Sequence, residues 1–144
     1  MLVDEMKVVL ASNFALYLKA ANFHWNVEGA DFPQYHAFLD SYYNDIYGTI
    51  DQLAEYIRAL NAYTPASFSR FTELSIVKDQ IEQLAVGPMF LQLQEDNNAV
   101  LQLLMDTFKT TQTENQQGIA NFLAERIDAM QKHAWMIRSI LKSA

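Results

Sequence analysis

The chain has 144 residues, a formal net charge of −7 and no cysteine, which excludes disulfides, thiolate metal sites and cysteine nucleophiles. Hydrophobic residues make up 51% of it, so residues 1–144 are expected to form one globular domain rather than a disordered or fibrous protein. The negative charge opposes non-specific binding to nucleic acid. No signal peptide is recognised and no run of 18 apolar residues predicts a membrane span, so we expect a cytoplasmic protein.

Apolar residues recur at helical spacing along most of the chain, which predicts an all-α fold. The first helix is expected over about 4–27, ending before Gly29, a residue suited to stopping a helix. The second is expected over about 31–61, with Asp31 as N-cap and Pro33 in the first turn. The apolar stripe of the first helix is predicted to contain Met6, Val9, Leu10, Phe14, Tyr17, Leu18 and Ala21.

The connection that follows cannot continue the second helix, because it contains Thr64, Pro65 and Ser67. A short helix is predicted within 67–85, and a third long helix over about 87–111. Thr113 with Gln116 is a possible capping box for a fourth helix that ends near residue 142. Four long helices with one long central crossover, which carries the short helix, predict a ferritin-like four-helix bundle of the up-down-down-up type.

Four metal-ligating side chains lie on one face of the second predicted helix. At the rotation of an ideal α-helix, His36, Asp40, Asp51 and Glu55 fall within about 100° of one another. His36 and Asp40 are one turn apart and can hold one metal ion, as can Asp51 and Glu55. Either pair alone is more often a solvated surface pair than a metal site. The combination of both pairs on one face favours a metal site.

The two pairs cannot share an ion within one chain. Asp40 and Asp51 are 11 residues apart, which is roughly 16 Å along a helix. If two copies of this helix cross antiparallel, residues whose numbers have the same sum face each other. The sum is 91 both for His36 with Glu55 and for Asp40 with Asp51. A two-fold axis between residues 45 and 46 therefore predicts a dimer with two identical sites.

His24, near the end of the first helix, is a candidate third ligand for each site. Imidazole and carboxylate ligands suit iron, and also Zn or Mn. No Glu-x-x-His pattern occurs, so the usual di-iron centre inside a ferritin bundle is not expected. Tyr43 and Tyr47 lie on the same face as the ligands. We interpret them as interface packing, with an electron relay as the alternative, and the proposed axis places Gly48 opposite Tyr43.

Several motifs resemble the Dps family of miniferritins, also called DNA-binding proteins from starved cells. The first helices contain His24-Trp25-Asn26-Val27-Glu28-Gly29, then Phe32, His36, Asp40, Asp51 and Ala54-Glu55, and the last helix contains Lys132-His133-Ala134-Trp135-Met136-Ile137-Arg138. The resemblance covers nearly the whole chain. It implies a hollow 12-subunit shell that oxidises Fe(II), usually with hydrogen peroxide in preference to oxygen, and keeps the ferric mineral inside. It also implies that the ferroxidase ligands are His24, His36, Asp40, Asp51 and Glu55, divided across a dimer.

The sequence departs from the family pattern in two places. It has no Lys-rich tail of the kind through which many members bind DNA. When the chain is aligned on Trp135, Gln117 and Asn121 take positions where carboxylates would line an iron pore, although Glu114 remains nearby. Two alternatives to an iron-storing ferroxidase stay open, namely a DNA-binding nucleoid protein and a structural assembly that holds Zn. His133 is interpreted as a structural residue, because the last helix offers it no carboxylate at a ligand spacing.

Overall fold

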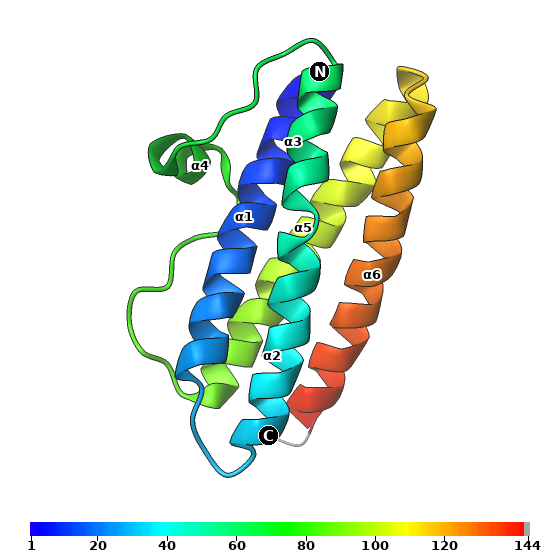
Figure 1. Cartoon of the computed structure of the whole chain (residues 1–144). Coiled ribbons are helices and arrows are strands. Elements are labelled where there is room, and N and C mark those ends of the chain that lie inside the picture. Colours follow the sequence, from blue (N-terminus) through cyan, green and yellow to red (C-terminus); the bar gives the residue numbers. More distant parts are fainter. Residues whose placement is uncertain (143–144) are drawn as a thin grey trace.

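In a computed structural model of the chain, in which residues 1–142 are described, the long helices pack into one bundle. The helices are α1 (Leu2–Asn26), α2 (Phe32–Tyr47), α3 (Ile50–Ala59), α4 (Phe68–Leu74), α5 (Val86–Thr113) and α6 (Gln117–Lys142). Helix α1 runs antiparallel to α2 and α3, the chain then crosses over, and α5 runs antiparallel to α6 (Figure 1). This arrangement confirms the predicted ferritin-like topology.

The turn between α1 and α2 matches the expected helix signals. Val27 leaves the helix with an extended backbone, and Gly29 has φ +127°, a region that side chains with a Cβ rarely adopt. Asp31 takes the N-cap position as predicted, but its side chain makes no capping hydrogen bond. Pro33 lies in the first turn. The glycine thus permits the tight reversal that places the start of α2 beside the end of α1.

The second predicted helix is interrupted, so the expectation of one helix from 31 to 61 is wrong. Helix α2 ends at Tyr47 and α3 begins at Ile50, although the two continue in nearly the same direction (Figure 1). The Thr49 hydroxyl donates to the Ile46 carbonyl at 2.7 Å, and the Thr49 N–H bonds the same carbonyl at 3.0 Å. A threonine that competes for a helical acceptor, directly after a glycine, weakens the helix at this point.

The predicted short helix in the crossover is present as α4. The Ser67 hydroxyl caps it by accepting a hydrogen bond from the Arg70 N–H at 3.2 Å. Phe71 of α4 packs against Phe14 of α1, with ring centroids 4.9 Å apart. Helix α4 therefore lies outside the bundle, on the exposed side of α1 (Figure 1).

The predicted capping box for the last helix does not form. Thr113 belongs to the last turn of α5, where its hydroxyl donates to the Lys109 carbonyl at 3.3 Å. Asn115 then reverses the chain with φ 55°, a left-handed conformation that asparagine tolerates better than most residues. Helix α6 begins at Gln117 instead.

The core lies between α1, α2–α3, α5 and α6. Met6, Val9, Leu10 and Ala21 of the predicted stripe are buried, whereas Leu18 is 44% exposed and Phe14 and Tyr17 are half-buried. Phe14 and Leu18 line a hollow beside α4, whereas Tyr17 packs against Tyr43 and Tyr47 of α2. The largest buried side chains include Tyr42, Phe23, Phe90, Leu16, Leu39, Ile46, Leu53, Ile57 and Met89. Among the described residues, no helix is long and apolar enough to cross a membrane.

Candidate metal centre

Two histidines from neighbouring helices hold each other in place by reciprocal hydrogen bonds. His24 Nδ1 of α1 lies 2.8 Å from the backbone oxygen of His36, and His36 Nδ1 of α2 lies 2.8 Å from the backbone oxygen of His24. Their rings stack with centroids 3.8 Å apart and planes inclined by 14°. Phe32 stacks on His36 at 4.8 Å. The two imidazoles are therefore fixed in position and orientation before any ligand binds.

This geometry determines which ring nitrogen can bind a metal. A carbonyl oxygen only accepts hydrogen bonds, so the proton of each neutral imidazole must lie on Nδ1. Each Nε2 then has a free lone pair, as metal ligation by histidine requires. The tautomers of His24 and His36 are thus both selected by the protein backbone.

Asp40 lies beside these histidines and is oriented by a neighbour. Asp40 Oδ1 is 3.8 Å from His24 Nε2, and the Asp40 side chain is 56% exposed. Asn44 Nδ2, one turn further along α2, donates to Asp40 Oδ1 at 3.2 Å and to the Asp40 backbone oxygen at 2.8 Å. The structure therefore places His24 next to both His36 and Asp40, while their role as metal ligands remains a prediction. Asn44 is a neighbour of Asp40 that sequence reasoning missed.

The other two predicted ligands lie apart from this group. Asp51 and Glu55 are exposed on α3, beyond the interruption after Tyr47. Within the part of the chain that the structure describes, no three histidine, aspartate or glutamate side chains form a group ready to hold a metal ion. The single chain therefore offers two separate sets of ligands, and their combination across a dimer remains a prediction.

A second polar cluster ties α2 to α6 on the opposite side of α2. Arg126 donates to Asp45 through two nitrogens, at 3.1 and 2.7 Å, and His133 Nε2 lies 2.8 Å from Asp45 Oδ2. Burial raises the pKa of Asp45, but the hydrogen bonds and charges of His133 and Arg126 outweigh this effect and hold that pKa well below its usual range. The carboxylate that His133 lacks on its own helix is therefore supplied by α2.

The interior of the bundle contains further paired polar groups. The Tyr42 hydroxyl donates to Asn97 Oδ1 at 2.9 Å, and Lys19 Nζ donates to Asp96 Oδ2 at 2.8 Å. Burial raises the pKa of Asp96, and Lys19 opposes that rise. Asp45 and Asp96 are therefore both already bonded to side-chain cations.

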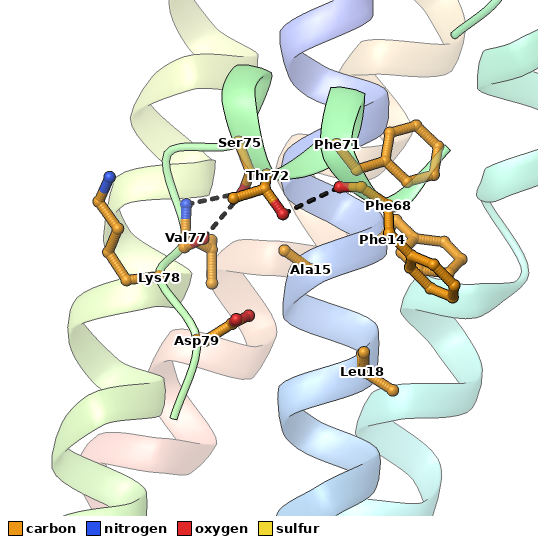
Figure 2. A pocket seen from close by; sticks show the side chains of 10 residues that line it. All are labelled: Phe14, Ala15, Leu18, Phe68, Phe71, Thr72, Ser75, Val77, Lys78 and Asp79. Carbon is orange, nitrogen blue, oxygen red and sulfur yellow. Dashed lines mark hydrogen bonds between the residues drawn. The ribbon is translucent and has the colours of Figure 1, made fainter. Parts of the chain in front are cut away.

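A hollow of about 390 Å³ lies away from the candidate ligands, between α1 and α4 (Figure 2). Its walls are mainly apolar, with Phe14, Leu18, Phe71 and Val77 among them, and Lys78 and Asp79 at one side. It contains no histidine and a single carboxylate. Its chemistry therefore does not suit a metal centre.

Comparisons with known proteins agree with the fold and with the family resemblance. A family model for the ferritin-like domain matches residues 4–144. An uncharacterised low temperature-induced protein of Nostoc sp. is 30% identical over 136 residues, which cover 92% of this chain and 75% of that protein. The DNA protection during starvation protein of Helicobacter pylori is 26% identical over 139 residues, or 96% of each chain. The crystal structure of Dps from Staphylococcus aureus superposes with a TM-score of 0.93 at 26% identity, covering 97% of this chain and 94% of that one.

Proposed function

Since the chain belongs to the ferritin-like family, in its Dps branch, we propose that it oxidises Fe(II) and stores the ferric product inside a hollow shell. The shell would be a homo-dodecamer built from two-fold dimers, and the oxidant would be hydrogen peroxide or oxygen. We also propose that the protein acts in the cytoplasm and limits oxidative damage by removing free Fe(II). Iron is the substrate of this activity.

The observation that carries the proposal is the pair of locked histidines beside Asp40. Each histidine keeps its Nε2 lone pair free, Asp40 Oδ1 lies 3.8 Å from His24 Nε2, and both tautomers are already correct for a divalent ion. Half of a metal site is thus preorganised in the isolated chain. The proposed axis would bring Glu55 and Asp51 of a second copy opposite this half. Glu55 would complete the site, and Asp51 would bridge to a second ion that is bound more weakly.

These ligands favour oxidation for an electrostatic reason. Carboxylates attract Fe(III) more strongly than Fe(II), because the interaction energy grows with the charge of the ion. A site with anionic oxygen ligands therefore makes Fe(II) easier to oxidise. With peroxide, two Fe(II), one H₂O₂ and two protons give two Fe(III) and two water molecules, which balances atoms and electrons.

Two other functions are less well supported. The formal net charge of −7 disfavours a DNA-binding nucleoid protein, because binding to DNA depends on lysine and arginine neutralising phosphates. A structural assembly that holds Zn has the same ligand set in its favour, since imidazole and carboxylate also bind Zn, and Mn. Only a redox measurement separates this last alternative from the ferroxidase.

The deciding experiment measures Fe(II) oxidation under peroxide and under oxygen, in the wild type and in Glu55→Gln. The substitution removes the charge with little change in volume, so it should abolish fast oxidation while the shell still assembles. Glu125→Gln, an exposed change on α6, is the matched control and should retain the wild-type rate. Added Zn should inhibit the wild type by competition. Equal rates in Glu55→Gln and wild type would exclude this site, and Zn binding without any Fe(II) oxidation would favour the structural assembly.

A further inference from the structure

The last turn of α1, which contains His24, is tied to the crossover by side-chain amides. Asn26 Nδ2 donates to Asn22 Oδ1 at 2.8 Å, and Asn22 Nδ2 donates to the Gln80 backbone oxygen at 3.3 Å. Gln83 Nε2 donates to the Asn26 backbone oxygen at 2.9 Å and to the Leu84 backbone oxygen at 3.2 Å. These bonds link residues of α1 to residues 57 and 58 positions later in the chain.

The crossover follows α1 toward this end of the helix (Figure 1). The Ile76 N–H donates to Ser12 Oγ at 3.1 Å, near the middle of α1. Residues 80 and 83 then meet residues 22 and 26 through the bonds described above. Gln92 of α5 also donates to Gln80 Oε1, so the crossover is bonded to a second long helix at this level. Its position beside the last turn of α1 is therefore fixed at several points.

The end of α1 needs such partners, because the last carbonyl groups of an α-helix have no donor within the helix. Two of these carbonyls receive a side-chain donor from another part of the chain. His36 Nδ1 of α2 bonds the His24 carbonyl at 2.8 Å, and Gln83 Nε2 of the crossover bonds the Asn26 carbonyl at 2.9 Å. One donor is a candidate metal ligand and the other is not. The last turn of α1 is thus held by both α2 and the crossover.

This single turn of backbone controls both candidate imidazole ligands. Its His24 carries the ring that bonds to the His36 backbone oxygen, and the His24 carbonyl accepts the bond that orients the His36 ring. Helix ends fray when their terminal groups lack partners. Fraying here would displace the His24 ring and release the His36 ring in one movement, so a bond that prevents it acts on two ligands at once.

We propose that Gln83 is a positioning residue of the metal site, which acts through the last turn of α1 to keep His24 and His36 in their binding arrangement. Asn22 assists it by anchoring the same turn to Gln80. The effect is reciprocal, because a contact that favours ion binding must itself be favoured when the ion binds. Occupancy of the site should therefore stabilise the attachment of the crossover to α1.

The test uses Zn as the probe and the complete, metal-free protein. Gln83→Met keeps the length of the side chain but removes its N–H donors. Zn affinity measured by titration calorimetry should fall by about 2- to 10-fold, the range that corresponds to one net hydrogen bond. Gln102→Met is the matched control, because Gln102 is also exposed and its amide donates to Asp106 within α5. This control should bind Zn as the wild type does.

Hydrogen exchange distinguishes positioning from a general loss of stability. In metal-free Gln83→Met, exchange should become faster in residues 22–27 and stay unchanged in the buried parts of α5. Added Zn should slow exchange in residues 22–27 again, because the ion restores the same arrangement. Unchanged Zn affinity in Gln83→Met, an equal loss of affinity in Gln102→Met, or faster exchange throughout the bundle would each overturn the inference.

The inference rests on the site of the proposed function, but the two can fail separately. If the wild type binds Zn and Gln83→Met weakens that binding, while neither protein oxidises Fe(II), the positioning role stands and the ferroxidase is excluded. If the wild type oxidises Fe(II) rapidly and Gln83→Met binds Zn equally well, the ferroxidase stands and the positioning role is excluded. A wild type that binds no Zn and oxidises no Fe(II) would overturn both.

Discussion

The proposed division of the ligands between two chains can be tested by complementation. One variant, His36→Ala, lacks a ligand on α2, and the other, Glu55→Gln, lacks a ligand on α3. Along the helix axis, Asp40 and Asp51 are separated by roughly 16 Å, whereas bonds from Zn to nitrogen or oxygen ligands are only about 2.0–2.2 Å long. No single chain can close such a gap. Each variant alone should therefore lack every site, while a mixed dimer should combine two intact halves at one of its two positions.

The size of the recovery follows from symmetry. When equal amounts of the two variants are co-expressed and pair at random, half of the dimers are mixed and each has one intact site. About one quarter of the wild-type number of sites should return. The assay is the number of Fe(II) ions oxidised rapidly per chain in shells that carry both affinity tags. Co-assembly of His36→Ala with Asp40→Asn is the matched control and should recover nothing, because both changes damage the same half. Absence of recovery in the first mixture, in shells shown to contain both variants, would refute the shared site.

The other predictions concern support of the site, stability, iron uptake and DNA. Asn44→Ala should weaken binding of a divalent ion by about 10- to 100-fold, because Asp40 loses its orienting hydrogen bonds, and titration calorimetry with Zn would contradict this if the affinity were unchanged. Because the pKa of Asp45 is depressed in the folded protein, its carboxylate stabilises the fold above its unfolded pKa of about 3.9, and this stabilisation is lost as the pH falls toward the folded pKa. Below about pH 5, the unfolding free energy of Asp45→Asn should therefore depend less on pH than that of the wild type. At pH 7 that variant should be about 1–2 kcal/mol less stable, a range reduced because the carboxyl group is about one third exposed. Gln117→Asp with Asn121→Asp should speed Fe(II) uptake at low salt, with a gain that shrinks as salt rises, while oxidation of pre-bound iron is unchanged; no change in uptake would argue that these residues do not line the pore. Plasmid DNA should not be retarded at about 0.1–0.15 M salt, and a clear shift in a gel would count against this expectation.

The fold could be predicted because helical periodicity and spacing signals are local. The expected helices, the crossover helix and the reversal at Gly29 all depend on residues close together in the sequence. The interruption after Tyr47 was missed because Gly48 and Thr49 do not disturb the apolar pattern, and only the bond from the Thr49 hydroxyl to Ile46 shows the competition. The prediction of a capping box was wrong although Thr113 and Gln116 match the sequence pattern. The left-handed conformation of Asn115 between them reverses the chain, so Thr113 ends one helix instead of starting the next.

The candidate site could be proposed from the sequence to the extent that its candidate ligands follow helical spacing. His36 with Asp40, and Asp51 with Glu55, are each four residues apart, so the sequence alone places each pair on one side of a helix. The reciprocal bonds between His24 and His36 depend on the packing of α1 against α2, which no local pattern contains.

The ion pair that joins α2 to α6 was missed for the same reason. Asp45 and Arg126 are 81 positions apart in the sequence, and only the assembled bundle brings them into contact. The supporting role of Asn44, in contrast, left a signal in the sequence. Asn44 lies four residues after Asp40, a spacing that suits a side-chain hydrogen bond within one helix.

The interruption between α2 and α3 has a consequence for how two sites in a dimer behave. It separates the His36–Asp40 pair from the Asp51–Glu55 pair within each chain, and the proposed two-fold axis passes only a few residues away. In the proposed dimer, each chain would give its α2 ligands to one site and its α3 ligands to the other. A small change of bend at Gly48–Thr49 in both chains would therefore widen or narrow the two sites by the same amount, and a change in one chain would alter both. In that dimer the two proposed iron positions would be mechanically coupled, and their occupancy should be cooperative even though no residue would touch both.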